Sequence, residues 1–212
     1  MKILVIGANG KIGTHLCKKL RDHEAFIPVA MIRKEEQKEK FSGDGIETVT
    51  GDLEDSVKNL SGLCTGFDAI VFTAGSGGKT GADKTLLIDL DGAVKSMEAA
   101  KAAGVQRYVM VSALQAHNRE NWNTSIKHYY AAKHYADKEL MRSGLDYTIL
   151  RPGRLTDEPG TGKVSLSKNL PERGSIPRED VASVIVEVLS NKNTIGKDLD
   201  LLSGGGLKIS DL

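Results

Sequence analysis

The stretch that decides the fold is "KILVIGANGKIG", residues 2–13. The apolar run at 3–6 is typical of a strand that is buried on both faces of a sheet. Gly7, Gly10 and Gly13 follow it, and the next residues have the periodicity of an amphipathic helix. Strand, glycine-rich turn and helix together predict a βα unit that holds a dinucleotide phosphate at the helix N-terminus.

Each glycine of this loop has a separate expected task. Gly7 permits the sharp turn, Gly10 lets a pyrophosphate approach the backbone, and Gly13 lets the helix pack close to the sheet. A purely structural tight turn is the alternative, and the surrounding βαβ pattern favours dinucleotide binding over it. The cofactor contacts expected from the rest of the loop are Asn9, Lys11 and Ile12.

A second glycine-rich stretch, "TAGSGGKTGAD" at 73–83, contains a Gly-Lys-Thr triplet. An ATP-binding P-loop needs a glycine five positions before the Gly-Lys pair, and Thr73 stands there instead. The stretch also follows the fourth predicted strand and does not open the first βα unit. The sequence therefore argues against an ATPase.

The rest of the chain alternates apolar runs with helical periodicity. This alternation predicts an α/β fold with a doubly wound parallel sheet, the Rossmann architecture. The strands are expected at 2–6, 27–32, 46–50, 68–73, 107–112, 147–150 and 199–202, and the helices at 12–23, 84–103, 128–143 and 178–190.

Length and charge limit the possible partners. A chain of 212 residues fits one domain, here 1–212. Lys and Arg number 29 against 28 Asp and Glu, so no net positive field indicates nucleic acid or an anionic membrane. We expect a small-molecule substrate as partner, and the sequence leaves the oligomeric state open.

The remaining composition indicates a cytoplasmic protein. Cys17 and Cys64 form no CxxC pair, and a buried thiol is the ordinary outcome for Cys17 on an amphipathic helix. The N-terminal apolar run is too short for a signal peptide, and no stretch approaches the ~18 apolar residues of a membrane span.

The end of the second predicted strand bears on the choice of cofactor. NAD-binding proteins place an acidic residue there, against the ribose hydroxyls. This chain has Arg33 and Lys34, which suit a 2′-phosphate, so NADP(H) is favoured over NAD(H). Glu35 and Glu36 weaken this reading, although the first turn of a following helix would also favour them.

Two segments lack a clear period, 113–127 and 153–176. Both follow predicted strands at the carboxyl edge of the sheet, where ligands bind in this architecture. They are the candidate substrate loops, and 153–176 forms a small C-terminal substrate-loop region. Trp122 either lines the pocket or anchors the first loop, and the His, Cys and carboxylate spacing predicts no metal site.

Several motifs resemble those of the atypical short-chain dehydrogenase/reductases, in particular small NmrA-like and flavin/biliverdin reductase-like members. The resemblance covers nearly the whole chain. Its markers are "GANGKIG", "GDLED", "TAG", "AGVQRYVMVSA", "YYAAKHYADKELMRSGLDYTILRPG" and "IPREDVA".

The resemblance implies further cofactor contacts. Asp52 and Leu53 are expected to flank the adenine, although Asp52 can also be explained as a helix N-cap. Thr73, Ala74 and Gly75 are expected to pass beside the ribose and pyrophosphate. The second glycine-rich stretch would then be a wall of the cofactor site, with "GANGKIG" as the phosphate cradle.

The resemblance also implies an active centre of Ser112, Tyr129 and Lys133, with Lys133 reaching the cofactor's ribose as well. The ammonium is expected to lower the pKa of the phenol one helical turn away, so that Tyr129 donates a proton to a carbonyl that Ser112 holds. The alternative is an exposed helix pair and a serine that ends a strand. Tyr130 shares its face with His134 and is expected to pack.

Two departures from the family pattern limit the reaction. Asp89 stands where extended members often carry asparagine, and the chain ends soon after "LDLL" at 199–202, without the substrate domain of sugar epimerases. The short remainder of the chain argues against nucleotide-sugar epimerisation, because little protein remains to bind a large substrate. The leading hypothesis is an NADPH-dependent reductase of a small carbonyl, quinone or flavin-like acceptor, and the alternative is a non-catalytic NADP(H)-sensing regulator of NmrA-like type.

Overall fold

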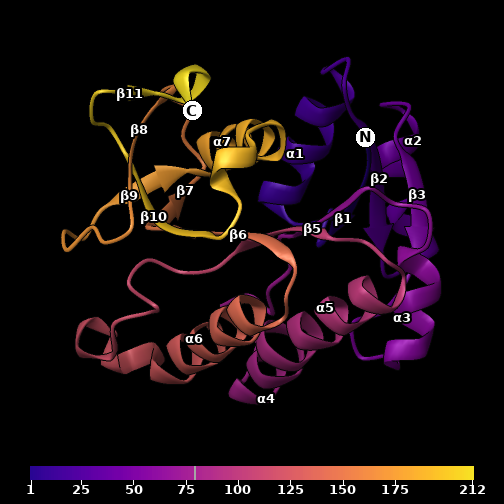
Figure 1. The fold of residues 1–212 in the computed structure, drawn as a ribbon, viewed down its shortest axis with the longest axis horizontal. Helices are drawn as coiled ribbons and strands as arrows, with labels where there is room; N and C mark the ends of the chain where they lie inside the picture. Colours follow the sequence, from indigo (N-terminus) through magenta and orange to yellow (C-terminus); the bar gives the residue numbers. More distant parts are fainter. Residues whose placement is uncertain (79) are drawn as a thin grey trace.

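A computed structural model describes residues 1–78 and 80–212. Lys79, which belongs to the Gly-Lys-Thr triplet, lies outside the described residues. A nine-stranded sheet forms the middle layer and helices cover both of its faces (Figure 1). The strand order is β11-β8-β10-β6-β5-β4-β1-β2-β3.

The first six strands of the chain form the parallel, doubly wound part of this sheet. Their order, β3-β2-β1-β4-β5-β6, reverses between β1 and β4, and β10 extends the parallel run beyond β6. Only β8 and β11 are antiparallel to their neighbours within the described sheet. The strands are β1 (Lys2–Ile6), β2 (Ile27–Ile32), β3 (Glu47–Thr50), β4 (Ala69–Phe72), β5 (Arg107–Val111), β6 (Asp146–Pro152), β8 (Lys163–Ser167), β10 (Lys197–Ser203) and β11 (Leu207–Lys208).

The predicted fold class and all seven predicted strands are confirmed. The strand positions follow from apolar runs that the sheet buries on both faces, as in β4 and β5, where every residue is buried. The strand predicted at 147–150 is longer in the structure, where β6 continues to Pro152 at the carboxyl edge of the sheet.

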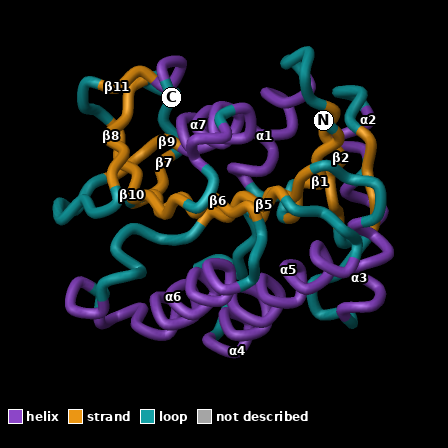
Figure 2. The backbone as a smooth tube through the Cα atoms, in the orientation of Figure 1, coloured by secondary structure: helices purple, strands orange, loops and turns teal. Residues whose placement is uncertain are grey.

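Helices form two layers (Figure 2). One face of the sheet packs against α1 and α7, and the other against α3, α5 and α6, with a separate apolar core on each face. The α-helices are α1 (Lys11–Arg21), α2 (Glu39–Ser42), α3 (Val57–Cys64), α4 (Ala82–Lys84), α5 (Ala93–Ala102), α6 (Lys127–Arg142) and α7 (Arg178–Ser190). Short 3₁₀ segments lie at Glu35–Gln37, Arg119–Asn121, Thr124–Ile126, Lys192–Thr194 and Ile209–Asp211.

The helix predicted at 84–103 contains a widened segment. A π-helix, Thr85–Gly92, joins α4 to α5. Asp89 is buried within this π-helix. Such segments often lie next to functional sites because they turn a side chain away from the regular helical position.

The structure differs from the sequence-based expectations in two places. The sequence pattern does not predict α3, since its eight residues are too few to show a clear period. Residues 153–176 do not form one loop: they contain β7 (Arg154–Thr156), β8 and the start of β9 (Ser175–Pro177), and β7 pairs with β9 in a small second sheet. Within the described chain, no helix combines the length and the apolar character needed to cross a bilayer.

Candidate functional site

The first cavity, of about 360 Å³, lies at the carboxyl ends of β1 to β4. This position is the point where the strand order reverses, the usual ligand site of a doubly wound sheet. Backbone and side chains from the glycine loop, the ends of β2 and β3, and the segment after β4 line it. Predicted cofactor residues on its walls are Gly7, Asn9, Gly10, Arg33, Asp52, Leu53, Thr73, Ala74 and Gly75.

The three glycines of the loop have different surroundings. Gly7 has φ +84°, and a Cβ there would lie 2.5 Å from the backbone N of Ala74. A Cβ on Gly13 would lie 2.4 Å from Gly7 O, which fits its predicted role in close packing. A Cβ on Gly10 would meet only Gly7 O, at 3.1 Å, so the space in front of Gly10 is free for a ligand.

Five of the predicted cofactor residues do not line this cavity. Ile12, in the first turn of α1, is buried in the core, and Gly13 packs against the loop. Lys11 forms an ion pair with Asp157. Lys34 is exposed outside the cavity, and Lys133 is buried beneath β5. Their contact with the cofactor stays a prediction.

The ribose end of the cavity carries Arg33. Gln37 accepts hydrogen bonds from the backbone N–H groups of Arg33 at 2.9 Å and Lys34 at 3.2 Å, which fixes the turn after β2. Glu35 begins a 3₁₀ segment, as its predicted helical position requires, and accepts a hydrogen bond from Thr50 Oγ1 at 2.5 Å. The carboxylate of Glu35 is thus engaged at the end of β3.

The segments after β3 and β4 form the opposite walls. Asp52 is not a helix N-cap, because α3 begins later and Ser56 caps it. Asp52 Oδ1 instead accepts a hydrogen bond from Glu54 N at 3.0 Å. Thr73 is tied to Ile6 O by its backbone N at 2.8 Å and by its hydroxyl at 3.0 Å, which places "TAG" against the glycine loop.

The sequence did not reveal three basic or acidic side chains near this cavity. Lys40 Nζ donates to Asn9 O at 3.0 Å and to Asn9 Oδ1 at 3.1 Å, so a cation lies directly on the glycine loop. Lys84 and Glu54 form an ion pair of 2.6 Å, and both line the cavity. These three residues are far from the glycine loop in the sequence, and no pattern in the sequence links them to it.

A second cavity, of about 760 Å³, lies at the carboxyl ends of β5 and β6. Both candidate substrate segments contribute to it, together with the first turn of α6. It contains Ser112 and Tyr129 from the predicted active centre. Other lining side chains include Gln115, Asn121, Asn123, Tyr130, Leu155, Arg154, Arg173 and Arg178.

The three residues of the predicted active centre lie near one another without forming a hydrogen-bonded triad. Ser112 directly follows β5 and is 4% exposed, and its Oγ forms no hydrogen bond in the described chain. The hydroxyl nevertheless lies near the Asp137 carboxylate, where it opposes the rise that burial causes in the pKa of that group. Lys133 is 2% exposed, and its Nζ donates to Val111 O at 2.8 Å. Tyr129 is partly buried one turn earlier on α6.

The expected lowering of the Tyr129 pKa is wrong. Burial raises the pKa of the phenol, and the negative charges of Asp89 and Asp137 raise it further. Burial lowers the pKa of Lys133, although Asp89 and Asp137 oppose this shift. In the described chain the Lys133 ammonium donates to Val111 O and forms no hydrogen bond with the Tyr129 phenol, so it does not offset the rise in the phenol's pKa.

Asp89 also shapes the first cavity. It is 2% exposed, and its Oδ2 accepts a hydrogen bond from Ser76 N at 2.9 Å. A Cβ on Gly75 would lie 3.0 Å from Asp89 Oδ1. The carboxylate of Asp89 therefore ties the π-helix to the segment after β4.

Tyr130 packs as predicted, yet it also lines the second cavity. Its ring stacks on Trp122 with centroids 6.1 Å apart, and Trp122 meets His134 edge-on. Ala116 O accepts from Trp122 Nε1 at 3.1 Å and lies 2.9 Å from His134 Nδ1. Trp122 thus anchors the first substrate segment and does not line the pocket.

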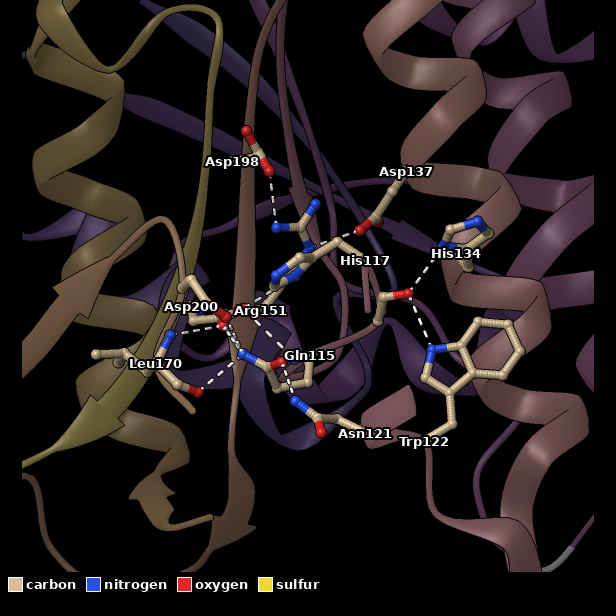
Figure 3. A network of polar contacts seen from close by, with 12 residues as sticks. Gln115, His117, Asn121, Trp122, His134, Asp137, Arg151, Leu170, Asp198 and Asp200 are labelled. Atoms are coloured by element: carbon tan, nitrogen blue, oxygen red, sulfur yellow. Dashed lines mark hydrogen bonds and ion pairs between the residues drawn. The ribbon is translucent and has the colours of Figure 1, made fainter. Parts of the chain in front are cut away.

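A buried polar network fixes the wall of the second cavity (Figure 3). Gln115 has φ +61°, the only positive φ among the described non-glycine residues. Its Nε2 donates to Asp200 Oδ2 at 2.7 Å, Asn169 Oδ1 at 2.7 Å and Leu170 O at 2.8 Å. One side chain therefore joins the two substrate segments to β10, which explains why the strained backbone persists.

Comparisons with known proteins agree with this arrangement. The sequence model of a family described as NAD(P)H-binding matches residues 7–192, from the first glycine of the loop to the end of α7. The chain belongs to this family. The match spans both cavities, and the predicted Rossmann protein related to short-chain dehydrogenase/reductases is confirmed at the level of family and fold.

Members and neighbours of this NAD(P)H-binding family are similar to nearly the whole chain. A Bacillus subtilis protein named "Uncharacterized sugar epimerase YhfK" is 56% identical over 96% of this chain and 95% of its own length. A Bacillus halodurans structure, named provisionally as an NAD-dependent epimerase/dehydratase, is 43% identical with a TM-score of 0.93, covering 99% and 97% of the two chains. The anaerobillin reductase ChuY of Escherichia coli O157:H7 is 26% identical with a TM-score of 0.82, covering 98% and 99%.

Proposed function

We propose that the protein is an NADPH-dependent reductase of a small carbonyl, quinone or flavin-like acceptor. The observation that supports this most is the second cavity, where Ser112 and Tyr129 share one wall at the same edge of the sheet as the glycine loop. The similarity to a protein named anaerobillin reductase adds support for reduction. Arg33 on the wall of the first cavity supports NADP(H).

The cofactor, when bound in the first cavity, supplies the hydride. Ser112 Oγ, buried and without a partner, donates a hydrogen bond to the acceptor oxygen. Tyr129 donates the proton that this oxygen takes up, and its raised pKa keeps the phenol protonated until charge develops on the acceptor. Lys133, one turn after Tyr129 on α6, would hold the cofactor's ribose.

A non-catalytic NADP(H) sensor is the second candidate. The observation that favours it is the absence of a hydrogen-bonded triad: in the described chain Ser112 Oγ has no partner and Lys133 binds Val111 O. A sensor would bind the cofactor tightly and turn nothing over. Sugar epimerisation, suggested by the name of the Bacillus subtilis relative, would interconvert sugars with no net consumption of NADPH.

One assay separates these functions. NADPH oxidation is followed at 340 nm with aldehydes, quinones and flavins, and Tyr129→Phe is compared with Tyr130→Phe. A reductase predicts steady consumption that falls by roughly 10² to 10⁴ in Tyr129→Phe with cofactor binding retained. Tyr130→Phe should change mainly the free energy of unfolding, since it loses packing on Trp122.

Normal turnover by Tyr129→Phe would remove this residue from the mechanism and leave acceptors that need no protein acid, such as flavins. Tight NADPH binding with no turnover of any acceptor would instead favour the sensor.

A further inference from the structure

The charge of the second cavity is not balanced. Three arginines line it, and none of the described lining residues is acidic. Arg154 begins β7, Arg173 lies in the segment before β9 and Arg178 begins α7, so three separate parts of the chain each bring an arginine to one cavity. The first cavity, in contrast, carries both signs of charge, with Arg33 and Lys84 beside Asp52 and Glu54.

Two of the three arginines are free to bind a ligand. Arg178 pairs with Asp157 at 2.5 Å, and Asp157 also pairs with Lys11. Arg154 and Arg173 form no ion pair with another described residue. Tyr130 and Arg173 line the same cavity, and the charge of Arg173 opposes the rise that burial causes in the pKa of the Tyr130 phenol.

The neutral part of the lining also suits an anion. The buried carboxylates near this wall are engaged by other groups. Asp200 accepts hydrogen bonds from Gln115 Nε2 at 2.7 Å and Leu170 N at 3.0 Å. Asp137 pairs with Arg151 at 2.7 Å, and Asp89 accepts a hydrogen bond from Ser76 N at 2.9 Å. Ser112 Oγ lines the cavity, is buried, and has no partner within the described chain, so a polar ligand group is expected beside it.

We propose that the acceptor is an anion, carrying a carboxylate or a phosphate that Arg154 and Arg173 bind while its reducible group lies at Ser112 and Tyr129. This inference rests on the proposed reductase function, because it names the substrate class of the same site. Guanidinium groups suit it physically: they stay charged at all working pH values and bind such oxyanions through two parallel hydrogen bonds.

Matched acceptors that differ only in charge test the proposal. Riboflavin 5′-phosphate is compared with riboflavin, and 4-carboxybenzaldehyde with 4-formylbenzamide, as substrates for NADPH oxidation by the whole protein. We expect kcat/KM to be at least about 10-fold higher for the anionic member of one pair, the value of one charge-assisted hydrogen bond. The pair that shows the difference distinguishes a phosphate from a carboxylate.

Variants identify the source of the preference. Arg173→Gln and Arg154→Gln should each lower the anionic preference by about 10-fold or more with little effect on the neutral acceptor. Arg142→Gln is the matched control, because Arg142 is exposed at the end of α6, pairs with Glu139 and lies outside the cavity. Equal kcat/KM for charged and neutral acceptors, in all these proteins, would overturn the proposal while leaving the reductase function intact.

If no acceptor is reduced, calorimetry still decides the question. Isophthalate and riboflavin 5′-phosphate are titrated into the NADP⁺-saturated protein, with isophthalamide and riboflavin as neutral controls. If an anion binds selectively, and its binding weakens about 10-fold in Arg173→Gln but not in Arg142→Gln, the anionic site is supported. Only the reductase function is then contradicted. Absence of such selectivity overturns the anionic site.

Discussion

The two cavities lie along one edge of the same sheet, but their walls are built from different parts of the protein. Backbone dominates the first: Gly7 and Gly13 pack against Ala74 and the loop itself, and the segment after β4 is tied to Ile6 O. Polar side chains dominate the second, where Gln115 joins three separate segments. A local motif therefore makes the cofactor cavity, whereas long-range hydrogen bonds make the acceptor cavity.

The largest expected effect concerns the backbone of the glycine loop. Gly7→Val places a side chain at φ +84° and 2.5 Å from Ala74 N, so we expect a loss of about 3 kcal/mol or more in the free energy of unfolding. Gly10→Val meets only Gly7 O at 3.1 Å and should unfold nearly as the wild type does, yet lose cofactor binding. Urea denaturation and calorimetry with NADPH measure both.

Wild-type NADPH affinity in Gly10→Val would show that the phosphate site lies elsewhere, and the stretch at 73–83 would again become its candidate. A Gly7→Val protein as stable as the wild type would show that backbone packing does not limit this cavity.

Removal of the carboxylate behind the second cavity should have the next largest effect. Asp200 is 0% exposed, and Asp200→Ala leaves Leu170 N without its acceptor and removes one of the three acceptors of Gln115 Nε2. We expect the free energy of unfolding to fall by about 3 kcal/mol. Asp211→Ala, at an exposed aspartate, is the control.

The cofactor cavity should survive this change. NADPH affinity at a temperature where Asp200→Ala remains folded is expected to stay within about twofold of wild type, because no residue of the network lines the first cavity. A loss of NADPH affinity in Asp200→Ala as large as the loss of stability would show that the two cavities are one cooperative unit.

Cofactor choice offers a smaller effect. Arg33 lines the first cavity and Lys34 does not, so NADPH should bind more tightly than NADH, and Arg33→Ala should cost NADPH about 1–3 kcal/mol. Lys34→Ala is the neighbouring control and should change little. Equal calorimetric affinities for NADPH and NADH, unchanged in Arg33→Ala, would refute the NADP(H) preference.

The smallest expected effect is a flat pH profile. Since burial raises the pKa of Tyr129 above its ordinary value of 10, the phenol keeps its proton as pH rises through 7 to 9. A proton donor with this pKa predicts no loss of kcat/KM over that range from Tyr129 ionisation. A basic limb near pH 7 to 8 that disappears in Tyr129→Phe would show instead that the bound state lowers this pKa.

Much of the cofactor half was predictable from the sequence because its determinants are contiguous. Apolar runs bury both faces of a parallel sheet, so the strands were found, and the spacing of Gly7, Gly10 and Gly13 marks a turn whose geometry depends on neighbours only a few residues away. The placement of Asp52 and Thr73 on the same cavity followed from the family resemblance.

The acceptor half was not predictable in the same way. The sequence predicts a loop at 153–176 because β7, β8 and β9 are short and carry no clear alternation. The pKa of Tyr129 was misjudged because helical spacing shows that Lys133 is one turn away, but not that its ammonium binds Val111 O. Burial depends on what packs around a residue, and a linear pattern does not contain that information.

The sequence by itself determined the doubly wound sheet, its glycine-rich turn and its membership of an NAD(P)H-binding family, since each depends on local spacing and on the periodic burial of apolar side chains. Only the tertiary structure brought Arg154, Arg173 and Arg178 to one cavity and placed Asp200 behind Gln115. Charges and hydrogen bonds act over a few ångströms in space, so residues far apart in the chain become partners only when the sheet order and the crossovers place them together.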